Sequence, residues 1–158
     1  MKLTDKIIAR AESSELGKKL HESGGKIVFT NGCFDIIHAG HVSYLSAAKA
    51  LGDILILGLN SDKSVKKLKG KSRPINTQQD RATVLAAFSF VDYVIIFEED
   101  TPYELIKELQ PDILVKGGDW HRDQIVGSDL VLKRGGKVLS LSYVQGLSTT
   151  NILDKLKG

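Results

Sequence analysis

The sequence has little of what marks secreted or membrane-spanning chains. Its 158 residues contain a single cysteine, Cys33, so an internal disulfide is excluded and the chain has no need for an oxidising compartment. No apolar run approaches the length of a membrane span, and the first ten residues include Asp5 and lack the apolar centre of a signal peptide. We therefore expect a cytoplasmic chain with no membrane partner.

Aromatic residues and excess charge are also scarce. Aromatics make up 6% of the sequence and the formal net charge is only +3, whereas single-strand nucleic-acid surfaces combine basic grooves with aromatic stacking platforms. Three prolines against fifteen glycines and a 42% hydrophobic content are typical of a folded domain. The length suits one domain with a full core. We expect a charged helical lead-in over residues 1–23, a single domain over residues 24–158, and no nucleic-acid partner.

Five short apolar runs alternate with amphipathic segments. They cover residues 26–29, 53–59, 91–97, 113–115 and 137–141. Apolar runs of this length predict buried parallel strands, and the helices between them imply right-handed crossovers. The sequence therefore predicts a Rossmann-like, doubly wound α/β domain with a five-stranded parallel sheet. In such a sheet the loops at the carboxyl edge converge on one crevice, where the strand order reverses.

The segment from Thr30 to His41 is the most informative part of the chain. It reads Thr-Asn-Gly-Cys-Phe-Asp-Ile-Ile-His-Ala-Gly-His, between the first strand and an amphipathic helix. A strand-turn-helix junction presents free backbone N–H groups at the positive end of the helix dipole and so favours phosphate. His38 and His41 are three residues apart and would face the same ligand, while Gly40 leaves room for its approach. The segment matches neither common glycine-rich phosphate motif.

Other roles for the two histidines are less well supported. A structural zinc site needs four ligands, but the chain offers one cysteine and only two further histidines. A purely structural role on an exposed helical turn stays open as an alternative.

Two further segments suit phosphate binding. Residues 63–73 carry six positive charges in eleven residues, and a basic loop beyond the carboxyl edge of a sheet can contact phosphate, although lysine runs are more often solvated surfaces. Near the end of the chain, Ser148, Thr149 and Thr150 open the last helix, where capping and phosphate binding use the same groups.

These segments together resemble a known family. The segment from Thr30 to His41, called the signature below, is similar to the His-x-Gly-His motif of the nucleotidyltransferase superfamily. The resemblance narrows to the adenylyltransferase half of ADP-heptose synthase through these segments: Phe29-Thr-Asn-Gly-Cys-Phe-Asp-Ile-Ile-His-Ala-Gly-His41, Leu59-Asn-Ser-Asp62, Leu68-Lys-Gly70, Ser72-Arg-Pro-Ile75, Asp80-Arg81, Val91-Asp-Tyr93 and Val115-Lys-Gly-Gly-Asp-Trp120.

The resemblance implies an activity as well as a fold. AMP would be transferred from ATP, bound with Mg²⁺, to D-glycero-β-D-manno-heptose 1-phosphate, giving ADP-heptose and pyrophosphate for surface glycans such as the lipopolysaccharide core. The partners would be ATP and a sugar 1-phosphate, and the chain would form a homo-oligomer, as related enzymes commonly do. The five strands would follow the order 3-2-1-4-5.

The resemblance also assigns roles to single residues. The catalytic set would be His38, His41 and Lys69. The nucleotide site would be formed by Asn31, Gly32, Cys33, Phe34, Gly40, His41, Gly117, Asp119, Trp120, Ser148, Thr149 and Thr150. The substrate site would be formed by Asp35, Asn60, Lys67, Lys71, Arg73 and Arg81. Simpler roles stay open for four of them, since Cys33 could be a small buried turn residue, Asp35 and Asp119 could be turn or cap residues, and Trp120 could simply pack.

Two alternative functions remain open. Trp120 stands where ADP-heptose synthases more often carry tyrosine, and glycerol-phosphate cytidylyltransferases carry tryptophan there. A cytidylyltransferase acting on glycerol 3-phosphate or a similar small phosphate is therefore one alternative, because no residue pattern here separates adenine from cytosine. A catalytically silent nucleotide-binding subunit is the other, and the intact His38, His41 and Arg81 argue against it.

Overall fold

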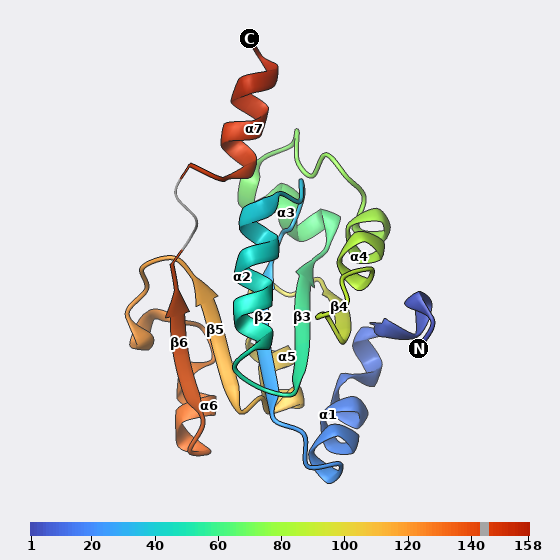
Figure 1. Cartoon of the computed structure of the whole chain (residues 1–158), viewed down its shortest axis with the longest axis vertical. Helices are drawn as coiled ribbons and strands as arrows, with labels where there is room; N and C mark the ends of the chain where they lie inside the picture. The colour runs from blue at the N-terminus through green and yellow to red at the C-terminus, as the bar shows by residue number, and fades with distance from the viewer. Residues whose placement is uncertain (143–145) are drawn as a thin grey trace.

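A single parallel sheet forms the centre of the molecule. The computed structural model describes residues 1–142 and 146–158, and within them six strands pair in the order β1-β4-β3-β2-β5-β6 (Figure 1). Their bounds are β1 (Ile7–Ile8), β2 (Ile27–Gly32), β3 (Ile54–Asn60), β4 (Tyr93–Phe97), β5 (Ile113–Gly117) and β6 (Lys137–Leu141). Every pairing is parallel. The predicted doubly wound α/β architecture is confirmed.

The sheet has six strands rather than the predicted five, so the predicted strand number was wrong, whereas the five predicted strands, numbered by themselves, keep the order 3-2-1-4-5. Residues 7 and 8, which we expected to be helical, pair with Val94 and Ile95 and add a sixth strand beside β4. The ammonium group of Lys6 anchors this segment, donating to the carbonyl oxygen atoms of Phe88 at 3.2 Å and Val91 at 2.8 Å. Two residues are too few for a hydrophobic period to reveal a strand. Residues 1–23 are therefore only partly helical, with short 3-10 turns and one α-helix, α1 (Ser13–Glu22).

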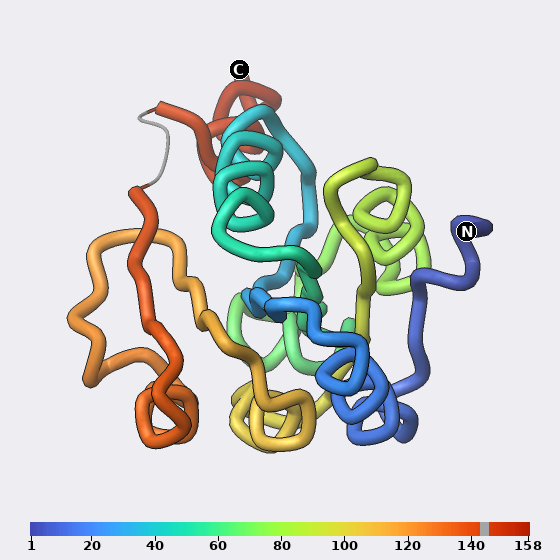
Figure 2. The backbone as a smooth tube through the Cα atoms, turned by 60° about the horizontal axis from the view of Figure 1, so that its bottom comes forward, coloured from blue at the N-terminus to red at the C-terminus, as the bar shows by residue number. Residues whose placement is uncertain are grey.

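Helices cover both faces of the sheet (Figure 2). The helices α2 (Ala39–Lys49) and α4 (Gln78–Ala86) lie on one face, and α1, α5 (Tyr103–Leu109) and α6 (Ser128–Lys133) lie on the other. Successive strand residues alternate between the two cores: Val28 packs with the first group of helices, while Ile27 and Phe29 pack with the second. Burial on both faces explains why the central strands are continuously apolar.

The strand order reverses between β2 and β5. Val28 of β2 pairs with Leu55 of β3 on one side and with Ile113 of β5 on the other. The connections that follow β2 and β5 therefore run in opposite directions and leave a crevice between them at the carboxyl edge. Ligands bind in this crevice in sheets of this kind. The helices α3 (Asp62–Lys69) and α7 (Thr149–Leu156) lie beyond that edge (Figure 1).

Among the described residues, no helix combines the length and the apolar character needed to cross a lipid bilayer.

Candidate functional site

Three adjoining cavities lie at the carboxyl edge of the sheet. The main cavity, about 400 Å³, is lined by His38, Gly40, His41, Tyr44, Lys69, Gly146, Leu147, Ser148, Thr149, Thr150 and Asn151. The central cavity, about 200 Å³, is lined by Asn31, Gly32, Cys33, Phe34, Asp35, His41, Tyr44, Lys69, Arg73, Lys116, Gly117 and Thr149. The outer cavity, about 130 Å³, is lined by Asn31, Pro102, Lys116, Trp120, Gln124, Ile125 and Val126. Neighbouring cavities share lining residues, so the three form a row.

The backbone at the start of α2 fixes the protonation pattern of both histidines. His38 is the N-cap of the helix, and its Nδ1 atom accepts a hydrogen bond from the Gly40 N–H at 3.1 Å. The Nδ1 atom of His41 accepts one from the His38 N–H at 3.2 Å. A ring nitrogen that accepts a hydrogen bond carries no proton, so the proton of each neutral imidazole lies on Nε2. Each ring can therefore donate one hydrogen bond from Nε2 to a ligand in the main cavity.

Both rings are held close together and are neutral at physiological pH. Their centroids are 4.0 Å apart. Burial, followed by the neighbouring His38 and Lys69, lowers the pKa of His41 to about 4, and burial also lowers the pKa of His38. A bound anion would reverse part of this effect, because it favours the protonated form.

The tight turn before α2 depends on two residues. Phe34 adopts a positive φ of 46°, which is uncommon for a residue with a side chain, and its buried ring meets His41 edge to face at 5.6 Å. A Cβ atom at Gly40 would lie 2.9 Å from the Nδ1 atom of His38 and 3.2 Å from the Cβ atom of Leu147. Glycine is therefore required where the first turn of α2 passes beneath His38.

The N-terminus of α7 faces the main cavity from the other side. Ser148 is its N-cap and accepts from the Asn151 N–H at 2.9 Å. The hydroxyl group of Thr149 donates to the Ile36 carbonyl oxygen at 3.2 Å, which ties α7 to the turn that precedes α2. The prediction that Ser148, Thr149 and Thr150 open the last helix is confirmed. Two helix N-termini thus line one cavity, an arrangement that favours an anion.

Three cations line the central cavity. Lys69 ends α3 and also lines the main cavity, Arg73 follows it in the loop, and Lys116 lies on β5. The other predicted basic residues lie elsewhere: Lys67 forms an exposed ion pair with Asp100 at 2.6 Å, and Lys71 is exposed and lines none of the three cavities.

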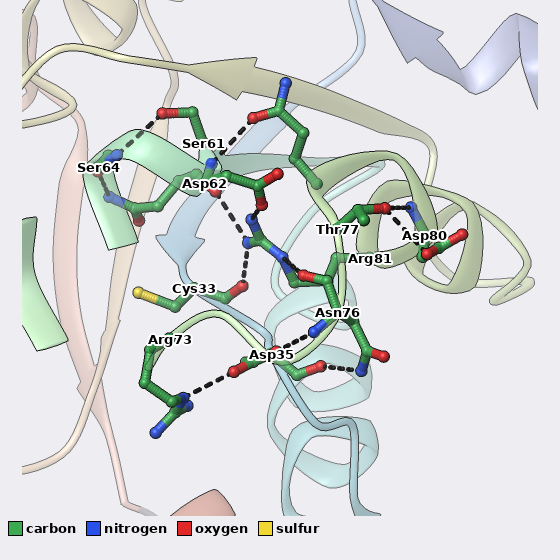
Figure 3. A network of polar contacts seen from close by, with 12 residues as sticks. Cys33, Asp35, Ser61, Asp62, Ser64, Arg73, Asn76, Thr77, Asp80 and Arg81 are labelled. Atoms are coloured by element: carbon green, nitrogen blue, oxygen red, sulfur yellow. Dashed lines mark hydrogen bonds and ion pairs between the residues drawn. The ribbon is translucent and has the colours of Figure 1, made fainter. Parts of the chain in front are cut away.

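A buried carboxylate holds Arg73 in place (Figure 3). Asp35 accepts from Arg73 Nε at 2.7 Å and from the backbone N–H groups of Ile75 and Asn76 at 2.9 Å each. Burial opposes ionisation, but the hydrogen bonds from Asn76, Ile75 and Arg73 outweigh it and hold the pKa of the Asp35 carboxyl below its ordinary value. Asp35 therefore docks the loop after α3 onto the turn after β2.

Arg81 forms a network of polar contacts from a buried position (Figure 3). It lines none of the three cavities, but with Asp35 and Asn76 it lines a separate cavity of about 140 Å³. Its guanidinium group is 1% exposed and donates to the carbonyl oxygen atoms of Cys33 at 2.6 Å, Asn60 at 2.8 Å and Asn76 at 3.1 Å, and to Asp62 at 2.8 Å. These contacts tie the connections after β2 and β3 to the start of α4. They give Arg81 a structural task, whereas its predicted contact with the substrate stays a prediction.

Two more predicted residues lie away from the cavities. Asn60 is buried, with its amide group donating to the Ser64 hydroxyl at 2.7 Å, and Asp119 is exposed. Neither lines any of the three cavities. By contrast, all the residues predicted in the turn, at Gly40 and Gly117, and at the start of α7 line at least one of the two larger cavities.

Among the lining residues that were not predicted from the sequence, two carry polar groups in the central cavity. Tyr44 lies one turn after His41 on the same side of α2, and its hydroxyl group is 2.6 Å from that of Thr30. Lys116 ends the apolar core of β5, directly before Gly117. The signal for Tyr44 was the helical spacing from His41, and for Lys116 it was a charged residue at the carboxyl end of a central strand.

Comparison with known proteins identifies close relatives. The profile of the cytidylyltransferase-like family matches residues 29–153. The chain is 53% identical to the bifunctional protein HldE of Wolinella succinogenes over 154 residues, and 57% identical to that of Nitratiruptor sp. over 155 residues. These matches cover 98% of this chain but 32% and 33% of the relatives. The chain thus spans about a third of the length of these curated relatives.

Solved structures agree with the fold. A lipopolysaccharide core biosynthesis protein from Thermoplasma volcanium superposes with a TM-score of 0.61 at 30% identity, covering 77% of this chain and 98% of that one. Pantoate-beta-alanine ligase from Francisella tularensis superposes with a TM-score of 0.63 over 96% of this chain and 76% of that one, but its 16% identity supports only a shared fold. The family match covers residues 29–153, and it agrees with the parallel sheet and with the turn that carries the two imidazoles. This chain belongs to the cytidylyltransferase-like family of nucleotidyltransferases.

Proposed function

We propose that this chain transfers AMP from ATP to D-glycero-β-D-manno-heptose 1-phosphate, giving ADP-heptose and pyrophosphate. The proposal is supported by the segments that resemble the adenylyltransferase half of ADP-heptose synthase and by identity above 50% to bifunctional protein HldE over nearly the whole chain. It is also supported by the likeness to a structure named as a lipopolysaccharide core biosynthesis protein.

The reaction requires charge stabilisation more than a strong base. An oxygen atom of the sugar phosphate is already anionic and forms the new bond to the α-phosphorus atom of ATP. The bond from that phosphorus atom to the α,β-bridging oxygen breaks, and its electron pair leaves with pyrophosphate. Such a transfer depends on in-line positioning and on groups that stabilise negative charge on the transferred and departing phosphates. No covalent intermediate with the protein is needed.

One arrangement carries the proposal: the two imidazoles held with Nε2–H facing the main cavity. His38 and His41 donate these hydrogen bonds to phosphate oxygen atoms of ATP, and neither acts as the nucleophile. The Lys69 ammonium group adds positive charge between the main and central cavities. Ser148, Thr149 and Thr150 receive the remaining phosphates at the N-terminus of α7. Arg73, held by Asp35, adds charge on the acceptor side.

Mg²⁺ enters this proposal as part of the substrate. The described residues contain no group of three or more His, Cys, Asp or Glu side chains that could hold a metal ion. Mg²⁺ commonly keeps several water ligands and binds nucleotide phosphates. MgATP is therefore the form of the nucleotide that we propose binds, and we assign no residue of this chain to the metal.

Pyrophosphate release tests the proposal. The chain is incubated with Mg²⁺ and either ATP or CTP, together with heptose 1-phosphate, other sugar 1-phosphates or glycerol 3-phosphate. We expect release that depends on both ATP and heptose 1-phosphate. Turnover with CTP and glycerol 3-phosphate alone would contradict the proposal in favour of the cytidylyltransferase alternative, which Trp120 favours. ATP binding without any turnover would favour a silent nucleotide-binding subunit.

A further inference from the structure

Lys116 is a half-buried cation that pairs with no carboxylate among the described residues. In that part of the chain its ammonium group forms neither a hydrogen bond nor an ion pair, and it lies over the Trp120 ring, 5.5 Å from Nζ to the ring centroid. Burial lowers the pKa of this group below its ordinary value, and the nearby Cys33 offsets this effect only in part. A partly desolvated cation that faces a cavity and has no carboxylate partner is stabilised by an anionic ligand, so this position suits an anion.

The position of Lys116 shows which anion it can reach. Lys116 and Asn31 are the residues that the central and outer cavities share, so the ammonium group lies at the junction between them. The central cavity in turn shares His41, Lys69 and Thr149 with the main cavity, at whose far side lie Ser148 and Thr150. The anion site at Lys116 therefore lies across the central cavity from the groups proposed to hold the triphosphate.

The in-line geometry of the reaction places the attacking and departing phosphates on opposite sides of the α-phosphorus atom. The attacking oxygen atom must approach the α-phosphorus atom from the side opposite to the departing pyrophosphate. If the departing phosphates lie in the main cavity, the attacking phosphate lies in the central cavity, on the side of Lys116. The remainder of the acceptor then extends into the outer cavity.

The outer cavity suits a small polyhydroxylated group. At about 130 Å³ it has a third of the volume of the main cavity. Asn31 and Gln124 offer amide groups that can both donate to and accept from hydroxyl groups. The Trp120 ring, fixed by a hydrogen bond from Nε1 to the Gly117 carbonyl oxygen at 3.1 Å, offers an apolar face for the C–H groups of a sugar.

We propose that the outer cavity is the subsite for the body of the phosphorylated acceptor, and that the Lys116 ammonium group binds the acceptor's phosphate. This inference rests on the proposed transfer to a phosphorylated acceptor, and it moves Trp120 from the nucleotide site to the acceptor site. Lys116 thereby becomes a substrate-binding residue in addition to those predicted from the sequence.

The only tryptophan of the chain provides the test, because Trp120 reports on this cavity alone. The chain is saturated with Mg²⁺ and α,β-methylene-ATP, which cannot transfer AMP, and is then titrated with heptose 1-phosphate while tryptophan fluorescence is recorded. We expect a saturable change on adding heptose 1-phosphate. In Lys116→Met we expect the midpoint to rise about 10- to 100-fold, the usual cost of losing a hydrogen bond to a charged group. Lys116→Arg should restore much of the affinity.

Steady-state kinetics provide the second measurement. Lys116→Met should raise the KM for the sugar phosphate by a similar factor and leave the KM for ATP within about twofold, since its contact is with one substrate only. Lys133→Met, which removes an exposed lysine of α6, is the matched control and should behave as the unmodified chain. A raised KM for ATP with an unchanged KM for the acceptor would overturn the inference, as would a fluorescence midpoint that Lys116→Met leaves unchanged.

Failure of the proposed function is distinguishable from failure of this inference. If the unmodified chain turns over glycerol 3-phosphate with CTP instead, the identity of the substrates was wrong. The same titration and kinetics are then run with glycerol 3-phosphate and α,β-methylene-CTP. The Lys116→Met effect on the acceptor is still expected, and its absence would still overturn the inference.

Discussion

Asp35 and Arg73 form a buried ion pair, with the Arg73 Nε atom 2.7 Å from Asp35 Oδ2 and the two side chains 1% and 13% exposed. Asp35 belongs to the signature turn, and Arg73 belongs to the loop after α3 that follows Lys69. The pair therefore joins the turn after β2 to the basic loop. Because two backbone N–H groups also donate to Asp35, the carboxylate organises the loop rather than pairing with a single cation.

Asp35→Asn should destabilise the fold. Breaking a buried ion pair costs about 3–5 kcal/mol, and because asparagine keeps one acceptor oxygen we expect the free energy of unfolding to fall by roughly 3 kcal/mol. Urea unfolding measures this change. Asp100→Asn is the control, since it breaks an exposed pair with Lys67 and should change stability by less than about 1 kcal/mol. Equal effects of the two variants would contradict the assigned role of Asp35.

Arg81→Met separates a structural role from a substrate-binding one. The four hydrogen bonds of the buried guanidinium group end on three backbone carbonyl oxygen atoms and one carboxylate, all of which lose their donor in the variant. We expect a loss of about 3 kcal/mol or more in the free energy of unfolding. If Arg81 acts chiefly on the substrate, the variant should keep its stability, and the KM for the sugar phosphate should rise instead.

The strands were predictable from the sequence where burial on both faces requires several consecutive apolar residues. The segments of β2 to β5 are largely apolar because both faces of these strands are covered, so short apolar runs indicate them. β6 is an edge strand with a partly exposed pattern and gives a weaker signal. β1 gave no such signal, since Ile7 and Ile8 form a strand only because the edge of β4 accepts them. Pairing of so short a segment is a tertiary effect that local pattern cannot report.

The candidate site was predictable where its residues are close together in the sequence. His38, Gly40 and His41 lie within one helical turn, so their proximity follows from spacing alone. Arg81 shows the opposite case, because its acceptors come from residues up to 48 positions away and nothing in its surroundings in the sequence reveals that it is buried. Lys116 lies between these cases, since its place at the carboxyl end of a central strand was a signal in the sequence, but its lack of a carboxylate partner is visible only in the folded chain.

The stability of the fold should depend on pH through His41. Its pKa is about 4 in the folded chain and near 6.5 when unfolded, so the unfolded state binds more protons between these values. The free energy of unfolding should therefore fall as pH drops from about 6.5 to about 4, and it should be unaffected by His41 above that window. Because His41 is only partly buried, we expect a loss of about 1–2 kcal/mol.

Urea unfolding at pH 7, 5.5 and 4.5 gives the free energy of unfolding of the unmodified chain and of His41→Gln. The value for the unmodified chain minus the value for His41→Gln should become smaller as the pH falls. His121→Gln, at an exposed histidine, should follow the unmodified chain throughout. Parallel curves for the unmodified chain and His41→Gln would show that His41 does not titrate as described.

Turnover should depend on His41 more strongly than nucleotide binding does. The negative charge that its Nε2–H meets grows as pyrophosphate departs, so His41→Ala should lower kcat by about 10²-fold or more. The Kd for α,β-methylene-ATP, measured by calorimetry, should change only a few-fold. Equal losses in kcat and in affinity would assign His41 to ground-state binding alone.

A crystal structure with Mg²⁺ and α,β-methylene-ATP tests the central claim most directly, because the claim is that the phosphates lie in the main cavity. We predict phosphate oxygen atoms within hydrogen-bonding distance of Nε2 of both His38 and His41, with the terminal phosphates at the N-terminus of α7. Phosphates bound away from both imidazoles, with the nucleotide otherwise ordered, would contradict the account.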